Sequence, residues 1–385
     1  MPAPSTLIRG GTILDGTGQP SFVSDVRLRG NCIEAIDVDL PVNDSEIVDA
    51  AGLFVTPGLI DLHAHVYHGT GIFSVDPTAV GLATGVTTLL DAGSAGSLSY
   101  ETFSRYVMPA VREEIYALLN ISQVGVQGHP QADPVSRDLY EAGHIDVEKA
   151  VACIERHPDR ILGAKARLTA WLANDRLENE QAAMHGVIEA ASRTGRWCMI
   201  HHVASAISKR ELLEALRPGD IVTHMYQGRG DSGFDATEGM PESAMIAARE
   251  RGIRFDVGHG IGSFVWRIAE PATQQHGFWP DTISTDIHQF NLHTVVFDMP
   301  TTMTKFLYLG MPLEEIVQRS TWEPAKIMGL DGRLGRLKKG LEADVALFHL
   351  EAGRHPLTDV EMQVRYGDRK FVPVMAFKSG NRFKA

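Results

Sequence analysis

Eight short apolar segments alternate with amphipathic segments through the middle of this 385-residue chain. Alternation of this kind predicts parallel strands joined by helices, and eight such units favour a closed (β/α)8 TIM barrel of the α/β class. The expected strands are Val55–His65, Val86–Asp91, Tyr116–Ser122, Arg160–Leu168, Trp197–His202, Asp220–Met225, Ile253–Val257 and Thr282–Asp286. Helices are expected at Val147–Ile154, Glu180–Ser192, Ser208–Leu216, Pro241–Arg251 and Pro312–Ser320.

Both ends of the chain have a different, β-rich pattern. Polar and apolar residues alternate near the N-terminus, and similar segments return at the C-terminus. The segments are Leu7–Leu14, Asp25–Leu28, Cys32–Ile36, Ala343–Phe348, Gln363–Tyr366 and Val372–Phe377. We therefore expect residues 1–54 and 335–385 to form one small β-sandwich domain beside a barrel of residues 55–334.

Charge and cysteine content narrow the class of protein. The net charge of −12 and the lack of a Lys/Arg cluster argue against a nucleic-acid partner. The three cysteines, Cys32, Cys153 and Cys198, are far apart, which suits a reducing compartment better than a disulfide framework. With no signal peptide and no membrane-spanning apolar run, we expect a cytoplasmic protein with a small-molecule substrate. A homo-oligomer stays open.

The first expected strand leads directly into His63 and His65. Alternate residues of a strand point to the same face, so both imidazoles can bind one metal ion. The pair alone is weak evidence because histidines also occupy cores. The whole segment Phe54-Val55-Thr56-Pro57-Gly58-Leu59-Ile60-Asp61-Leu62-His63-Ala64-His65, however, resembles the first barrel strand of the amidohydrolase superfamily, the metal-dependent (β/α)8 hydrolases.

Lys165 lies inside an apolar segment, where burying an amine is costly unless the amine is paired or modified. The plain alternative is a lysine whose long side chain reaches solvent at the strand end. The resemblance implies instead a lysine carbamylated by carbon dioxide, whose carbamate oxygens bridge two metal ions. Arg167 shares its face of the strand and is suited either to a substrate carboxylate or to a structural ion pair.

Three further strand ends carry candidate ligands. His201 and His202 are adjacent, so only one can face the metals, and the resemblance favours His201. His224 follows an apolar run, and Asp286 ends the last expected strand, where an aspartate can also cap a helix. The resemblance implies two divalent cations, expected to be zinc, held by His63, His65, Lys165, His201, His224 and Asp286.

Such a metal centre implies hydrolysis. In the mechanism that the resemblance implies, a hydroxide shared by the two cations would attack a carbonyl group, and Asp286 would carry its proton to the leaving atom. Tyr226 and His259 are candidate substrate contacts, with pocket-wall and structural roles as their alternatives. Only loop or supporting roles are given to His68, His129, His288 and His293.

Departures from known relatives indicate the substrate. Dihydroorotases have an arginine two residues after the second histidine, where this chain has Tyr67. The resemblance is therefore strongest to a deacetylase-like, dihydroorotase-like group that cleaves N-acyl amino acids or O-acetyl α-hydroxy acids. A cyclic-amide hydrolase of the hydantoinase kind shares every ligand and stays open. A non-catalytic structural homologue is disfavoured by the complete ligand set.

Overall fold

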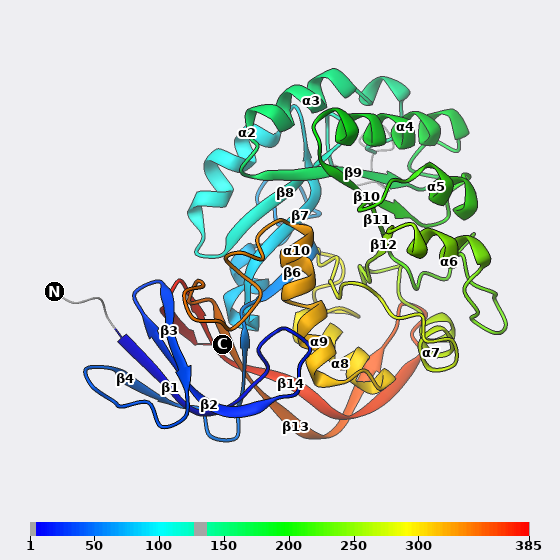
Figure 1. Cartoon of the computed structure of the whole chain (residues 1–385). Helices are drawn as coiled ribbons and strands as arrows, with labels where there is room; N and C mark the ends of the chain where they lie inside the picture. The colour runs from blue at the N-terminus through cyan, green and yellow to red at the C-terminus, as the bar shows by residue number, and fades with distance from the viewer. Residues whose placement is uncertain (1–4, 127–136, 385) are drawn as a thin grey trace.

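The computed structural model describes residues 5–126 and 137–384 and contains two sheets (Figure 1). The first sheet is parallel, curled, and ordered β12-β11-β10-β9-β8-β7-β6. Its strands are nearly continuous apolar runs, as expected for strands covered on both faces, and every residue of β7 is buried. The strands are β6 (Leu59–Ala64), β7 (Val86–Gly96), β8 (Glu114–Asn120), β9 (Ile161–Leu168), β10 (Trp197–His202), β11 (Ile221–Thr223) and β12 (Arg254–Phe255).

The eighth expected strand, Thr282–Asp286, is not a regular strand. Single parallel bridges join Thr282 to Asp256, just beyond β12, and Ile287 to Ala64 at the end of β6. The segment therefore lies between the two edges of the curled sheet. Asp286 has a left-handed backbone conformation (φ 48°), which ends the extended run at this point.

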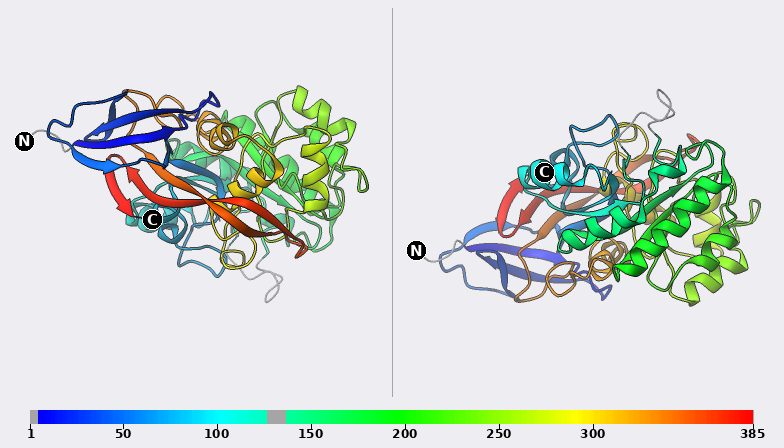
Figure 2. Two further views of the ribbon diagram at one scale, coloured as in Figure 1. Left: turned by 90° about the horizontal axis from the view of Figure 1, so that it is seen from below. Right: turned by 90° about the horizontal axis from the view of Figure 1, so that it is seen from above.

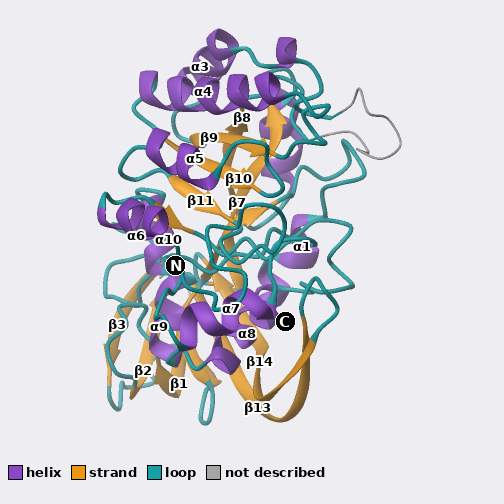
Figure 3. Ribbon diagram, turned by 90° about the vertical axis from the view of Figure 1, so that its right-hand side faces the viewer, coloured by secondary structure: helices purple, strands orange, loops and turns teal. Residues whose placement is uncertain are grey.

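Helices cover the outer side of the parallel sheet, and Figure 3 shows α3 and α4 together at the far end from β13 and β14. The five predicted helices are confirmed, with ends that differ by no more than three residues. Local caps define several of them; Asp146, for example, accepts from the Lys149 N–H at the start of α3. The helices are α1 (Pro77–Val80), α2 (Tyr100–Thr102), α3 (Val147–Arg156), α4 (Leu177–Arg193), α5 (Lys209–Ala215), α6 (Ser243–Glu250), α7 (Trp266–Gln274), α8 (Met299–Leu309), α9 (Leu313–Arg319) and α10 (Trp322–Ile327). Within the described residues, none combines the length and apolar character needed to cross a bilayer.

The second sheet is built from both ends of the chain, as Figure 2 shows in its blue and red strands. Its order is β15-β14-β13-β5-β1-β2-β3, with β4 also paired to β1. The two expected segments Gln363–Tyr366 and Val372–Phe377 are one long strand, β14, which pairs with β13 and packs against α8. The strands are β1 (Ser5–Ile13), β2 (Phe22–Arg29), β3 (Cys32–Asp37), β4 (Glu46–Asp49), β5 (Phe54–Pro57), β13 (Val345–Thr358), β14 (Val364–Lys378) and β15 (Asn381–Lys384).

The expected strand Val55–His65 is two strands in two different sheets. Its first part, β5, pairs with β1 and β13, whereas β6 pairs with β7. The division falls at Pro57 and Gly58. A Cβ atom at Gly58 would lie 2.3 Å from the Thr87 hydroxyl oxygen, so only glycine fits where the chain passes between the sheets.

Candidate metal centre

The six predicted ligand residues converge at the carboxyl end of the parallel sheet, where the loops after the strands surround a cavity of about 470 Å³. His63, His65, Lys165, His201 and Asp286 line this cavity. The sixth residue, His224, lies beside two of them: its ring centroid is 4.3 Å from that of His201, and its Nε2 is 3.9 Å from Asp286 Oδ2.

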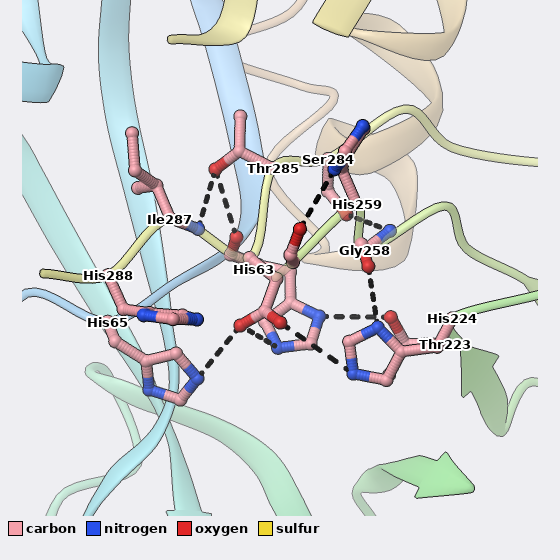
Figure 4. A network of polar contacts seen from close by, with 12 residues as sticks. His63, His65, Thr223, His224, Gly258, His259, Ser284, Thr285, Ile287 and His288 are labelled. Atoms are coloured by element: carbon pink, nitrogen blue, oxygen red, sulfur yellow. Dashed lines mark hydrogen bonds and ion pairs between the residues drawn. The ribbon is translucent and has the colours of Figure 1, made fainter. Parts of the chain in front are cut away.

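Asp286 lies at the centre of the group. Its Oδ1 is 3.4 Å from His63 Nε2 and 3.2 Å from His65 Nε2. Figure 4 shows His63, His65 and His224 close together at this place. One ligand atom from each of these three buried residues lies within 4.8 Å of the other two. Nitrogen and carboxylate oxygen atoms gathered at this spacing suit a divalent cation such as zinc.

Hydrogen bonds fix which nitrogen of two imidazoles faces the group. The Thr223 hydroxyl donates to Asp256 Oδ2 at 2.7 Å, so its oxygen accepts from Nδ1–H of His63 at 2.9 Å. His224 likewise donates from Nδ1 to the Gly258 carbonyl at 2.5 Å. Each His Nε2 therefore presents a lone pair to the centre, the arrangement that metal-binding histidines require.

The Nε2 atom of His224 is the clearest sign that the residues fit a metal ion. It is buried and has no hydrogen-bond partner within the described parts of the chain. A buried polar atom without a partner is costly, and a bound cation would satisfy it. Burial also lowers the pKa of His65 to about 3 and that of His224 to about 4, which keeps both imidazoles in the neutral, metal-binding form.

Lys165 is fully buried, so its side chain does not reach solvent. Its Nζ lies 3.2 Å from His63 Nε2 and 3.2 Å from the Met199 sulfur. Desolvation lowers the pKa of Lys165 to about 7, despite the opposing charges of Asp286 and Asp256. A neutral amine is therefore accessible near neutral pH, and a neutral amine is the form that reacts with carbon dioxide.

The two adjacent histidines of β10 point in different directions. His201 lines the cavity, and its Nε2 lies 3.1 Å from the Thr169 hydroxyl oxygen, which leaves Nδ1 as the ring nitrogen available to a metal. His202 is buried outside the cavity lining and donates from Nε2 to the Ile207 carbonyl at 2.8 Å. The geometry agrees with the choice of His201 as the candidate ligand.

Of the three expected substrate contacts, the structure places only Arg167 on the cavity wall. Arg167 lines the cavity, but Asp138 accepts two hydrogen bonds from its guanidinium at 2.9 and 2.7 Å, so its charge is already paired. The Tyr226 hydroxyl is buried and donates to the Phe278 carbonyl. His259 donates to the Gly260 carbonyl and lies 2.6 Å from Lys305 Nζ. Neither Tyr226 nor His259 is on the cavity wall, because other elements hold both side chains in the core.

Sequence reasoning missed several residues of the site. His288 lines the cavity and stacks on Phe73 with ring centroids 4.3 Å apart. Because alternate residues of an extended segment share a face, its position two residues after Asp286 could have indicated that His288 also faces the site. Asp256 accepts hydrogen bonds from Thr223, Thr282 and Ser284. Asp256 lies one residue before the end of the expected strand Ile253–Val257. His129 lies outside the described residues.

A buried group of histidines and a carboxylate at the carboxyl end of a curled parallel sheet defines an α/β enzyme with a candidate metal centre. A profile of the amidohydrolase family matches residues 265–383. The chain is 34% identical over 335 residues to "Deacetylase Atu3266" of Agrobacterium fabrum, which covers 86% of this chain and 79% of that protein.

Solved structures agree with this relationship. The fold resembles the crystal structure of a dihydroorotase with a TM-score of 0.87, 31% identity and 99% of each chain covered. It also resembles that of an adenine deaminase with a TM-score of 0.88, 25% identity and coverage of 99% of this chain and 100% of the other. The chain belongs to the amidohydrolase superfamily and is a hydrolytic enzyme, not a non-catalytic homologue.

Proposed function

We propose that this enzyme removes the acyl group from small acylated carboxylates, N-acyl amino acids or O-acetyl α-hydroxy acids. The observation that carries the proposal is the set of metal-facing atoms on the wall of one cavity, with His224 Nε2 buried and unpartnered among the described residues. The deacetylase name of a relative 34% identical over 86% of the chain supports the choice of reaction. In this proposal residues 282–287 serve as the eighth strand of a (β/α)8 barrel, and residues 1–54 and 335–385 form the second domain.

Two divalent cations, zinc in our proposal, would lower the pKa of a water molecule and polarise the substrate carbonyl. The residues that would hold them are His63, His65, carbamylated Lys165, His201, His224 and Asp286. Asp286 would take the proton of the attacking water and pass it to the leaving nitrogen or oxygen. Its side chain is 11% exposed and lines the cavity, so its carboxylate is accessible to both water and substrate.

Hydrolysis of a cyclic amide is the second candidate, since the dihydroorotase structure is 31% identical with a TM-score of 0.87. Dihydroorotate itself is disfavoured as the substrate by the residue at the position where dihydroorotases carry a carboxylate-binding arginine. Tyr67 occupies it here, is buried, and donates from its hydroxyl to the Ser99 carbonyl at 2.8 Å. Tyr67 is not on the cavity wall and carries no positive charge.

A substrate panel tests the proposal. Protein prepared with zinc and bicarbonate is assayed with N-acetyl amino acids, O-acetyl α-hydroxy acids, hydantoins and dihydroorotate, and bound metal is counted by mass spectrometry. We expect about two metal ions per chain and turnover of the acylated acids. Turnover limited to cyclic amides would contradict deacylation, and a protein that binds no metal would contradict the metal centre.

Two single substitutions test the ligand set. Lys165→Ala is expected to lose most of the bound metal and activity, because it removes the amine that in this proposal bridges the two cations as a carbamate. His202→Ala is expected to keep its metal, because His202 bonds to Ile207 away from the cavity. Metal content and circular dichroism are measured on both variants. The reverse pattern of metal loss would overturn the assignment.

A further inference from the structure

Two guanidinium groups lie on the wall of the cavity beside the candidate metal centre, and they differ in how their charge is balanced. Arg167 is fully paired with Asp138, whose side chain is completely buried. Arg229, in the loop after β11, is exposed, and within residues 5–126 and 137–384 no carboxylate lies within 4.0 Å of its guanidinium. Arg229 therefore has a positive charge available to a ligand in the cavity.

The backbone of Arg229 is held on both sides. Its N–H donates to the Gln227 side-chain oxygen at 2.6 Å, and its carbonyl accepts from the Ala204 N–H at 3.3 Å. Its guanidinium packs against the opposite loop, where a Cβ atom at Gly262 would lie 3.6 Å from Arg229 Cζ. Gly262 and Ala204 also line the cavity, so these contacts keep the long side chain at its edge.

Apart from the arginines and the candidate metal ligands, the wall of the cavity includes several large apolar side chains. Phe73, Trp171, Phe290 and Ile261 contribute to it. A ligand whose acyl group reaches Asp286 would place its other end among these side chains and the guanidinium. A carboxylate is the group that an arginine binds best, since its two oxygens match the planar fork of N–H donors.

We propose that Arg229 binds the substrate's carboxylate and thereby selects acylated acids over their uncharged counterparts. The inference rests on the proposed deacylase function and adds the residue that determines its substrate class. Arg167, for which the sequence left open a substrate carboxylate or a structural ion pair, is paired with the buried Asp138.

The test compares one acylated acid with its primary carboxamide, which has the same scissile bond but no negative charge. Arg229→Met is expected to lower kcat/KM for the acid about 100-fold, mainly through KM, because charge-assisted bidentate hydrogen bonds are lost. The carboxamide should change less than about threefold, and Arg229→Lys should restore part of the activity on the acid. Equal losses on both substrates, or none on the acid, would overturn the inference.

Titration of the free α-hydroxy acid, the deacylated product, gives a readout that does not need turnover. The zinc-loaded wild type should bind it, and Arg229→Met about 100-fold more weakly. A wild type that binds this acid but cleaves no acylated acid would contradict the proposed function and still support the carboxylate site. Equal affinities of wild type and Arg229→Met would contradict the site alone.

Two control variants complete the design. Arg210→Met removes an exposed arginine of α5 that pairs with Glu214 outside the cavity, and it should match the wild type on both substrates. Arg167→Met removes the paired guanidinium. If Arg167→Met rather than Arg229→Met caused the selective loss on the acid, the assignment to Arg229 would be wrong.

Discussion

Thr223 connects a metal-facing imidazole to a buried carboxylate. Its hydroxyl donates to Asp256 and accepts from His63, so it sets both the tautomer and the orientation of that ring. Losing such a supporting contact typically costs 10- to 100-fold in metal affinity. We therefore expect Thr223→Val to weaken zinc binding by about that factor, measured by competition with a chromophoric chelator.

Thr282 provides a matched control for Thr223. It also donates to Asp256, at 2.6 Å, but within the described residues its hydroxyl has no hydrogen bond to a candidate metal-binding histidine. Thr282→Val should therefore leave zinc affinity within about threefold of wild type while losing a similar buried hydrogen bond. If both variants lost the same zinc affinity, the loss would come from the missing hydrogen bond to Asp256 and not from the contact between Thr223 and His63.

Single residues also show where sequence reasoning succeeds. His63 and His65 could be predicted to share a face because the strand repeat of two is a local property of the sequence, and the resemblance of the whole segment implied their role as ligands. The structure brings both beside Asp286. The proposed role of Arg229 and the hydrogen bonds of Asp256 could not be predicted, because they depend on a loop conformation and on the register of three neighbouring strands. Of the two roles expected for Arg167, the structure shows the ion pair, and its partner Asp138 is distant in sequence.

Strand β7 passes so close to β9 that Gly93 contacts Lys165 directly. A Cβ atom at Gly93 would lie 2.8 Å from both Cβ and Cγ of Lys165, and its φ of 91° is unfavourable for other residues. We expect Gly93→Ala to displace the lysine and lower both zinc content and kcat/KM by about tenfold or more. Metal analysis and steady-state kinetics measure the two losses.

Gly52→Ala is the control that separates the effect of crowding from the effect of backbone strain. It also has a positive φ of 78°, but no atom of the described residues lies within 4 Å of the position its Cβ would take. Gly52→Ala should cost about 1 kcal/mol in the free energy of unfolding and leave zinc content unchanged. If Gly93→Ala also kept its zinc, the close approach of β7 would have no role in placing Lys165.

Elements with local signals were predictable, and those defined by distant partners were not. The helices follow from the 3.6-residue repeat and caps such as Asp146. The division of Val55–His65 between two sheets could not be foreseen, because β5 is paired by β13 from the far C-terminus. Within the described residues, the segment 282–287 is joined to the sheet by single bridges. The sequence pattern therefore predicted a more regular strand than the structure has.

A cluster of charged residues joins the two sheets of the whole molecule. Glu114 of β8 lies 2.9 Å from the Arg333 guanidinium and 3.2 Å from Lys378 Nζ of β14. Lys378 also pairs with Asp344 at 2.6 Å. The Glu114 side chain is 17% exposed, so these interactions are less screened than surface ion pairs. Glu114 therefore contributes to the attachment of the parallel sheet to the terminal sheet.

This cluster makes the stability of the fold depend on pH. Burial alone would raise the pKa of Glu114, but the hydrogen bond from Arg333 and the charge of Lys378 outweigh it and lower the pKa from 4.5 to about 2. The unfolded chain therefore binds the proton more readily than the folded chain. The contribution of Glu114 is present above pH 4.5 and is lost as the pH falls towards 2.

Glu114→Gln is expected to lower the free energy of unfolding by about 2 kcal/mol at pH 7, with the difference from wild type shrinking as the pH falls below about 4.5. Urea unfolding of both proteins between pH 3 and pH 8 measures this difference. Glu148→Gln is the control, because Glu148 pairs with Arg193 on the exposed surface, where salt screens the interaction. A Glu114→Gln difference that stayed constant with pH would mean that the side chain acts through packing and not through its charge.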